Sequence, residues 1–222
     1  MCIRDRDKIA AKHALASAGV PQARWFGFHA DEVTDSTAAN LLTELGSPVF
    51  VKPANMGSSV GVSRAETVEE VNAALDLAAS YDEWLVVEEG IDGREIEIAV
   101  LGNRSPRTSV PGEIVAGDAF YTYEDKYQDG VAKLLIPAPL DDAEVAEMSK
   151  LAIDAYKALR VDGLARADFF YEPGGRGWLV NELNTLPGFT PISMYPKMWE
   201  ACLLYTSPSP RDQRGSRMPS SA

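Results

Sequence analysis

Four polar residues in the C-terminal part of the sequence form two pairs, each with one residue between its members: Arg166 with Asp168, and Glu182 with Asn184. Both pairs lie in segments with the pattern of β-strands, in which residues two apart project to the same face. One guanidinium, two carboxylates and one amide are therefore expected on one patch. Carboxylate and amide oxygens are ligands that magnesium accepts, usually together with nucleotide phosphates. The spacing predicts a metal site at Asp168, Glu182 and Asn184.

A ladder of surface salt bridges is the alternative interpretation, because such ladders are common on exposed sheet faces. The surroundings favour the metal site, since Asn184 leads into the irregular segment 185–188 and the flanking strand residues are apolar like those of a core. These flanking residues are Phe169, Phe170, Leu179 and Val180.

A second group with chemical potential is Lys52-Pro53 at the end of a short strand pattern, followed by the Gly/Ser-rich segment 56–61. An ammonium beside a loop of free backbone N–H groups could hold phosphate. The spacing differs from that of a P-loop. Taken alone, the segment is equally well explained as an ordinary glycine-rich turn.

Alternating helical and strand patterns must position these residues. Residues 7–87 predict a small mixed α/β layer, and residues 94–183 predict two strands around Gly102-Asn103, a long amphipathic helix and a closing β-hairpin. Helices are expected over 7–17, around Leu41–Leu45, over 67–78 with a capping box at Thr67 and Glu70, and over 141–160; strands are expected over 24–28, 49–52, 84–87, 94–101, 108–114, 164–171 and 178–183.

Both ends of the sequence resemble translated sequencing-library DNA. Residues 1–6, MCIRDR, resemble a translated sequencing-library adapter, and residues 202–212, CLLYTSPSPRD, resemble the same adapter read from its other strand. Residues 216–222 match a translated flow-cell sequence. We expect 1–6 and 202–222 to be adapter-derived and 7–201 to be the biological segment. A natural disordered tail is the alternative, but it does not explain a match at both ends.

The charge balance excludes several classes of partner. The formal net charge is -12, and the segment without the two ends is more acidic still, so no basic excess is present for nucleic acid or an anionic membrane. Cys2 and Cys202 lie in the suspected adapter regions, which removes disulfide, zinc-thiolate and cysteine-nucleophile interpretations. No apolar run has membrane-spanning length. We expect a cytoplasmic protein.

Several short motifs follow one another in a set order: Lys52-Pro53, 57–62 (GSSVGV), Glu88-Glu89, 93–95 (GRE), 120–127 (FYTYEDKY), 166–168 (RAD) and 182–188 (ELNTLPG). Together they resemble the D-alanine-D-alanine ligases, over essentially all of residues 7–201. The resemblance implies an ATP-grasp fold of the α/β (α+β) class, with two α/β subdomains clasping a nucleotide. Residues 7–91 would form the central subdomain and 92–201 a truncated C-terminal catalytic subdomain.

The resemblance also implies residue roles, the first being ATP binding. Lys52 and Lys126 would contact phosphates, with Ser59 in the glycine-rich loop. Glu88 and the backbone near Glu89 and Ile91 would hold adenine, and Glu95 would bind the ribose hydroxyls. Asp168, Glu182 and Asn184 would hold two magnesium ions, with manganese as a possible substitute, that neutralise charge as the γ-phosphoryl group moves to a substrate carboxylate.

The remaining implied roles concern the second step, in which a second D-alanine attacks the acyl phosphate. Arg166 and the Gly188 backbone N–H would stabilise the oxyanion. Ser58 and Tyr127 would link a mobile loop to the site. Ser193 would bind the carboxylate of the second substrate, with Met194 beside it.

The implied function is ATP-dependent synthesis of D-alanyl-D-alanine for peptidoglycan precursors, with D-alanine substrates and a homodimeric parent protein. Tyr127 is typical of dipeptide-forming members, whereas D-lactate-ester ligases carry a histidine there; a D-lactate or D-serine ligase is the alternative. The resemblance also implies that the chain lacks the family's N-terminal domain, which helps bind the first D-alanine. The fragment alone could therefore be a nucleotide-binding module without ligase activity.

Overall fold

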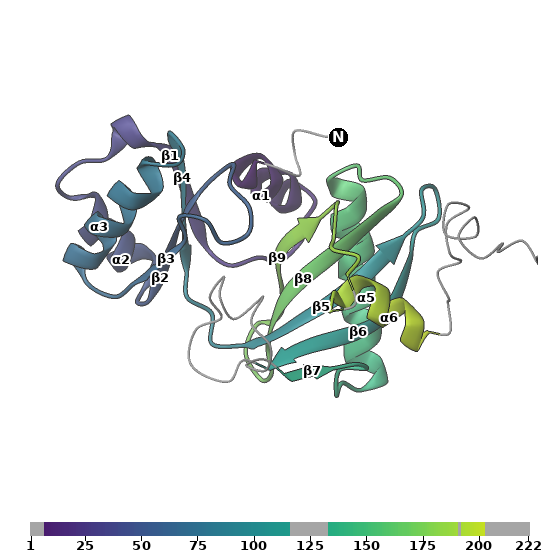
Figure 1. Cartoon of the computed structure of the whole chain (residues 1–222). Coiled ribbons are helices and arrows are strands. Elements are labelled where there is room, and N and C mark those ends of the chain that lie inside the picture. Colours follow the sequence, from purple (N-terminus) through teal and green to yellow (C-terminus); the bar gives the residue numbers. More distant parts are fainter. Residues whose placement is uncertain (1–6, 116–132, 191, 203–222) are drawn as a thin grey trace, which may run out of the picture.

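The computed structural model describes residues 7–115, 133–190 and 192–202. Two antiparallel sheets lie in separate halves of the molecule, with helices packed on each (Figure 1). Among the helices of the described residues, none is both long and apolar enough to cross a membrane.

The small sheet has the strand order β1-β4-β2-β3. One face is covered by the helices α2 (Thr37–Leu45) and α3 (Val68–Ala79), whose apolar residues enclose a core with Val49, Val51 and Leu85. The small sheet therefore has one face that is buried beneath helices. Its strands are β1 (Trp25–His29), β2 (Val49–Pro53), β3 (Ser63–Ala65) and β4 (Trp84–Glu89), with a 3-10 turn η2 (Ala30–Glu32) after β1.

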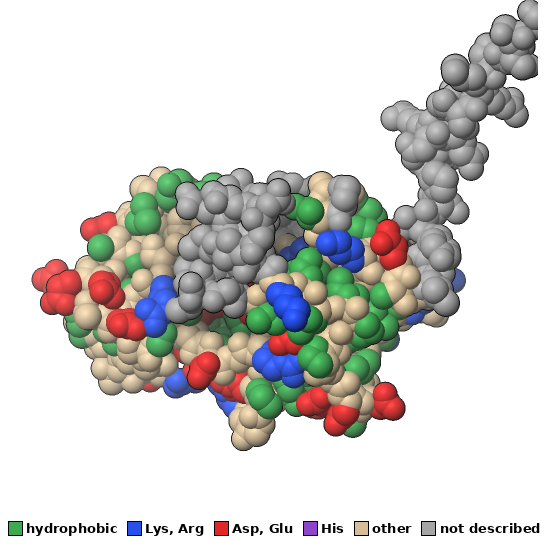
Figure 2. Space-filling model, turned by 60° about the horizontal axis from the view of Figure 1, so that its bottom comes forward, with side chains coloured by type: hydrophobic (Ala, Val, Ile, Leu, Met, Phe, Trp, Pro, Cys, Tyr) green, Lys and Arg blue, Asp and Glu red, His purple; other side chains and the backbone are tan. Residues whose placement is uncertain are grey.

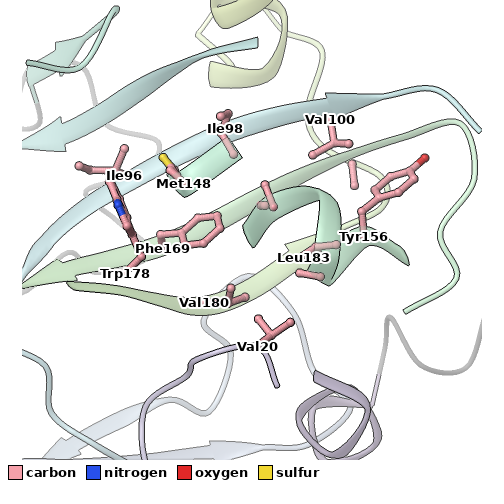
Figure 3. Close-up of a cluster of buried hydrophobic side chains, with 14 of the residues drawn as sticks. Val20, Ile96, Ile98, Val100, Met148, Tyr156, Phe169, Trp178, Val180 and Leu183 are labelled. Carbon is pink, nitrogen blue, oxygen red and sulfur yellow. The ribbon is translucent and has the colours of Figure 1, made fainter. Parts of the chain in front are cut away.

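The large sheet has the strand order β7-β6-β5-β8-β9, and all its neighbours are antiparallel. Helix α5 (Asp142–Ala158) covers one face and α6 (Met194–Ala201) packs on the other. Figure 3 shows the core under α5, where Ile96, Phe169 and Trp178 meet Met148. The strands are β5 (Arg94–Leu101), β6 (Arg107–Val115), β7 (Lys133–Leu135), β8 (Leu164–Glu172) and β9 (Gly177–Asn184).

Helix α1 (Lys8–Ser17) lies between the two halves. Its residue Leu15 and the following Val20 belong to the core of the large sheet. Its first residue, Lys8, instead reaches the small sheet, since its Nζ donates to Pro53 O at 3.1 Å. The helix thus contacts both units, although it precedes the small sheet in sequence.

The expected helices and strands are confirmed with boundary shifts of a few residues, and Asp7 caps α1 through bonds from the backbone of Ile9 and Ala10. The capping box at Thr67 is half formed: Thr67 accepts from Glu70 N, but Glu70 Oε2 accepts from Glu66 N. Besides the 3-10 turn η2, three elements were missed. The strands β3 and β7 are too short for a period to be read, and α6 contains Pro196, which is tolerated in a first turn but obscures a helix in the sequence.

Candidate functional site

The polar face of the large sheet carries the predicted metal-site residues. In the strand register Arg166 lies opposite Asn184, and Asp168 lies opposite both Glu182 on β9 and Glu97 on β5. The intervening residues of β8 point to the other face, where Ala165, Ala167 and Phe169 are buried in the core. The alternation expected from the sequence therefore holds here, and the polar side chains share one face.

The distances show that these side chains converge. Arg166 donates from Nε and Nη2 to the two carboxylate oxygens of Asp168, both at 2.7 Å, and its Nε lies 3.1 Å from Glu97 Oε2. Asn184 Nδ2 donates to Asp168 Oδ2 at 2.9 Å and to Glu182 Oε1 at 3.1 Å. Burial alone lowers the pKa of Arg166, but the charges of Asp168, Glu97 and Glu182 outweigh it and raise that pKa above its usual range.

The donor set fits a hard divalent cation. Asp168 and Glu182 carry carboxylate oxygens and Asn184 carries an amide oxygen, which are the ligand types that magnesium accepts. Asn184 turns its amide N–H toward the carboxylates and would present its oxygen to a cation after rotating. Within the described residues, no three or more His, Cys, Asp and Glu side chains form a group that could hold a metal ion. The candidate site instead combines two carboxylates with one amide.

A cavity of about 140 Å³ lies between the two halves and joins two of the metal-site residues to the predicted phosphate-binding lysine. Its walls include Lys52 from β2, Glu182 and Asn184 from β9, and Gly57 from the glycine-rich loop. Residues more than a hundred positions apart therefore meet at one cleft. A wider hollow of about 510 Å³ near Arg24 and Glu44 is lined by none of the predicted site residues.

Lys8 lines the same cavity and was missed by the sequence analysis. Its Nζ also donates to Met56 O at the start of the glycine-rich loop. Burial and the nearby positive charge of Lys52 lower the pKa of Lys8, against the opposing effect of Glu182 and Glu88. Two ammonium groups thus face the carboxylates across the cleft. The only signal in the sequence was Lys8 following the helix cap Asp7, which is too common a pattern to indicate a site.

Glu88 at the end of β4 lies at the base of the cleft and is 3% exposed. Its carboxylate is 2.7 Å from Lys52 Nζ and 2.9 Å from Lys12 Nζ. Burial by itself raises the pKa of Glu88, but the two ammonium groups lower it to about 2. A permanently ionised Glu88 therefore orients Lys52. Its predicted contact with adenine stays a prediction.

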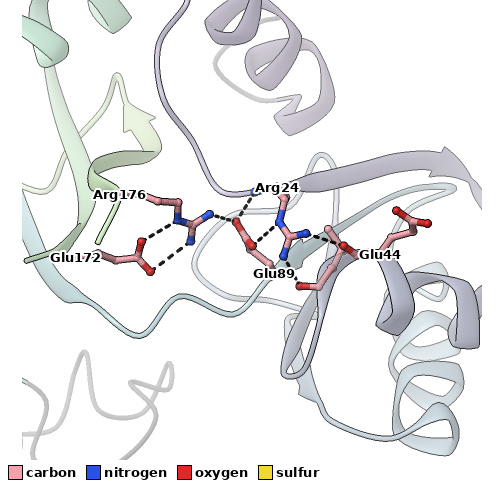
Figure 4. Close-up of polar contacts among 6 residues, drawn as sticks. Arg24, Glu44, Glu89, Glu172 and Arg176 are labelled. Carbon is pink, nitrogen blue, oxygen red and sulfur yellow. Dashed lines mark hydrogen bonds and ion pairs between the residues drawn. The ribbon is translucent and has the colours of Figure 1, made fainter. Parts of the chain in front are cut away.

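Glu89, the next residue, points away from the cleft, as alternation in a strand requires. It accepts from Arg24 and Arg176 (Figure 4). The predicted adenine contact of Glu89 would use its backbone and not its side chain. The side-chain bonds to the two arginines therefore leave that prediction open. Ile91 follows in the segment between β4 and β5, and Glu95 lies exposed on β5, on the same face as Glu97.

The glycine-rich loop has an unusual backbone. Ser58, Ser59 and Gly61 have φ angles of 54°, 59° and 71°. A Cβ on Gly61 would lie 2.7 Å from Pro53 and 2.8 Å from Tyr81, so both its conformation and its surroundings require glycine. Successive turns of this kind orient backbone N–H groups toward a common point and favour anion binding.

The predicted substrate-binding residues lie in and after the segment that follows β9. Ser193 Oγ is 2.9 Å from Thr190 Oγ1 and accepts from Thr190 N at 3.0 Å, and a Cβ at Gly188 would lie 2.6 Å from Ser193 Oγ. Gly188 and Ser193 are therefore brought together. Met194 is buried against Gly112 and the rest of α6. Lys126 and Tyr127 lie outside the described residues.

The charges on one face of the molecule are unevenly placed. In Figure 2, Asp and Glu side chains (red) gather toward the two outer ends of the face and several Lys and Arg side chains (blue) lie between them. On this face, basic side chains therefore lie among acidic ones, although the net charge of the chain is negative.

Two antiparallel sheets around a cleft that unites lysines and carboxylates define the ATP-grasp class of fold, and solved ligases of that fold are similar to this chain. The D-alanine-D-alanine ligase from Coxiella burnetii matches with a TM-score of 0.74 and 38% identity, over 89% of this chain and 52% of that one. The VanG D-Ala:D-Ser ligase from Enterococcus faecalis matches with a TM-score of 0.77 and 33% identity, over 89% of this chain and 57% of that one.

The chain belongs to the family described as D-ala D-ala ligase C-terminus, whose model matches residues 14–205. It is 50% identical over 197 residues to a D-alanine--D-alanine ligase of Bacillus velezensis, covering 87% of this chain and 55% of that protein. A ligase of the same name from a Thermoanaerobacter species is also 50% identical, with 55% of its length covered. The chain thus spans about half the length of the curated relatives it matches.

Proposed function

We propose that this chain is the nucleotide-binding and catalytic part of an ATP-dependent D-alanine-D-alanine ligase that serves peptidoglycan synthesis. The observation that carries the proposal is the cleft in which Lys8 and Lys52 face Glu182 and Asn184. Cations on one wall and metal-binding oxygens on the other suit a magnesium-bound triphosphate, whose charge needs both.

In the proposed reaction the carboxylate of one D-alanine attacks the γ-phosphorus of ATP, so that ADP leaves and an acyl phosphate forms. Lys8 and Lys52, with Lys126, hold the phosphates, while Glu88 and Glu95 position adenine and ribose. Two magnesium ions at Asp168, Glu182 and Asn184 would supply positive charge to the transferring phosphoryl group. The structural contribution is mainly positioning, because phosphoryl transfer asks little covalent chemistry of the protein.

In the second step the amine of another D-alanine attacks the acyl phosphate and releases inorganic phosphate. Arg166 and the Gly188 N–H stabilise the oxyanion, and Ser193 binds the carboxylate of the incoming substrate. Arg166 suits this role because the carboxylates of Asp168 and Glu97 fix its guanidinium on the polar face of the large sheet. Ser58 and Tyr127 close the site against water, which would hydrolyse the intermediate.

Glu182→Gln tests the metal site directly. Glutamine keeps the shape of the side chain but removes the charge, and loss of even an outer-shell partner of a metal ligand weakens binding by about 10–100-fold. We expect magnesium-dependent ATP affinity, measured by calorimetry, to fall at least about tenfold. Glu147→Gln is the matched control, because Glu147 is exposed on α5, on the opposite face of the sheet. Equal affinity in both variants would remove Glu182 from the metal site.

The substrate is tested with the chain joined to the N-terminal region of a relative, supplying D-alanine, D-lactate or D-serine and identifying the product. We expect D-alanyl-D-alanine. Preference for D-serine is the outcome that would contradict this, and the similarity to a D-Ala:D-Ser ligase makes that comparison necessary. For residues 7–201 alone we expect ATP binding without dipeptide synthesis, since lost positioning of the first substrate removes up to about 7–11 kcal/mol of barrier reduction.

A further inference from the structure

The carboxylate of Glu89 joins parts of the chain that otherwise lie in different halves of the molecule. It is 6% exposed and accepts three hydrogen bonds: from Arg24 N at 2.7 Å, from Arg24 Nε at 2.7 Å and from Arg176 Nη1 at 2.5 Å. Figure 4 shows Glu89 between the two guanidinium groups. A carboxylate with this many charge-assisted bonds has little freedom to move.

The two arginines come from different units. Arg24 lies in the segment between α1 and β1, and its guanidinium also donates to the carbonyls of Glu44 and Leu45 at the end of α2, at 2.7 and 2.9 Å. Arg176 lies in the turn between β8 and β9 of the large sheet, where it pairs with Glu172 at 2.8 Å. Glu89 itself ends β4 of the small sheet. One carboxylate therefore ties the small sheet to the β8–β9 hairpin.

The position of Glu89 connects this link to the cleft. Its neighbour Glu88 points into the cleft and orients Lys52, and the β8–β9 hairpin carries Asp168 and Glu182 on its polar face. The angle between the two sheets sets the separation of Lys52 from these carboxylates. Fixing the hairpin turn to the end of β4 therefore fixes the width of the cleft.

We propose that Glu89, bound by Arg24 and Arg176, is a positioning residue for the nucleotide site, which holds the two sheets at the spacing that a magnesium-bound triphosphate requires. The inference rests on the proposed function, because the nucleotide is what the spacing serves. Glu89 acts through the two sheets and does not touch the phosphates. The pair of Arg176 with Glu172 lies within the hairpin and does not connect the two sheets.

The exposure of the partners separates this role from general stability. The side chains of Arg24 and Arg176 are 59% and 43% exposed, and without Arg176 the buried carboxylate of Glu89 keeps both hydrogen bonds from Arg24, so removing one of the two ion pairs changes the free energy of unfolding little. The link between the halves still depends on these ion pairs. Among the described residues, the hydrogen bond from Arg176 connects the β8–β9 turn to Glu89. Loss of Arg176 should therefore alter the cleft more than the folded state of either unit.

The test compares variants of the full chain by magnesium-ATP affinity and by thermal unfolding midpoint. In Arg176→Ala we expect the Kd to rise at least about fivefold, the lower end of common coupling between sites, with little change in Tm. Arg176→Lys, which keeps a charge that reaches Glu89, should recover part of the affinity. Glu172→Gln breaks only the pair within the hairpin, and Arg104→Ala removes an exposed arginine from the β5–β6 turn; both should bind like the wild type.

A double-mutant cycle assigns the effect to the link. Glu89→Gln combined with Arg176→Ala should bind no more weakly than the weaker single variant, because both remove the same contact. Additive losses, or wild-type affinity in Arg176→Ala, would overturn the inference while leaving the proposed function standing. No magnesium-ATP binding by the wild-type chain would overturn the proposed function, and the inference with it.

Discussion

Glu88 shows how single residues prepare the cleft. A buried carboxylate is costly unless it is paired, and here it lies between Lys52 and Lys12, one from each side of the cleft. The arrangement keeps Glu88 ionised and uses one of its oxygens to hold Lys52 at the wall that the phosphates would meet. Removing one of these three charged side chains would leave an uncompensated charge in a site with little exposure to solvent.

The titration of Glu88 gives a prediction for stability against pH. Because its folded pKa of about 2 is below its ordinary value of 4.5, its contribution is fully present above that value and is lost as pH falls toward 2. The loss is on the order of 3 kcal/mol across this window. We expect the free energy of unfolding in urea to fall more steeply between pH 6 and pH 3 in the wild type than in Glu88→Gln. Glu66→Gln, at a half-exposed position, should keep the wild-type slope; equal slopes in all three would contradict the ion-pair arrangement.

The site was partly predictable from the residues. The convergence of Arg166, Asp168 and Asn184 followed from alternation within strands, which is a local rule. The contribution of Lys8 and Lys12 could not be found in this way, because it depends on how α1 packs across a chain distance of more than forty residues. The role of Glu89 side-chain contacts was missed for the same reason, since Arg24 and Arg176 are far apart in sequence.

At the scale of elements, α1 is the part of the fold that local patterns describe least well. Its helical period was visible, but the face that it buries and the sheet that it joins were not. Leu15 packs into the core of the large sheet, while Lys8 and Lys12, which come earlier in the helix, reach the cleft. The same limit explains why β3 and β7 were missed, since three-residue strands are defined by their partners. The division at residues 91 and 92 stays a prediction.

Leu15→Ala tests the packing of α1. Leu15 is 2% exposed, and truncating a buried leucine leaves a cavity that costs about 2–5 kcal/mol. We expect this loss in the free energy of unfolding, together with weaker magnesium-ATP binding, because the helix that carries Lys8 would be displaced. Leu77→Ala on α3 is the control; this leucine is 45% exposed, and the change should cost less than about 0.5 kcal/mol. Equal effects in urea unfolding would show that α1 is not anchored by Leu15.

At the scale of the whole molecule, two separate cores meet at one polar cleft. The core under α2 and α3 and the core under α5 share no buried residue. Contacts between the halves among the described residues include the polar ones of Glu88 and Glu89, the docking of α1, and the backbone bond from Val180 N to Pro21 O. Such a joint is weaker than a core, so the two units can open independently when no ligand spans them. A ligand bound between the lysines of one wall and the carboxylates of the other would couple the opening of the two units.

Amide hydrogen exchange tests this coupling. A ligand that binds only the closed, folded arrangement stabilises it by about 2.7 kcal/mol at a hundred times its Kd, which slows exchange through opening by about 100-fold. Because the cleft takes Lys52 from β2 and Glu182 from β9, magnesium-ATP should protect amides in both sheets. Val51, which pairs with Val87 in the small sheet, and Ala167, which pairs with Ile98 in the large sheet, serve as reporters. Removing magnesium with a chelator should reduce the protection in both. Protection of Val51 alone would mean that the nucleotide contacts the small sheet without engaging Asp168, Glu182 and Asn184, and the assignment of the metal site would then be wrong.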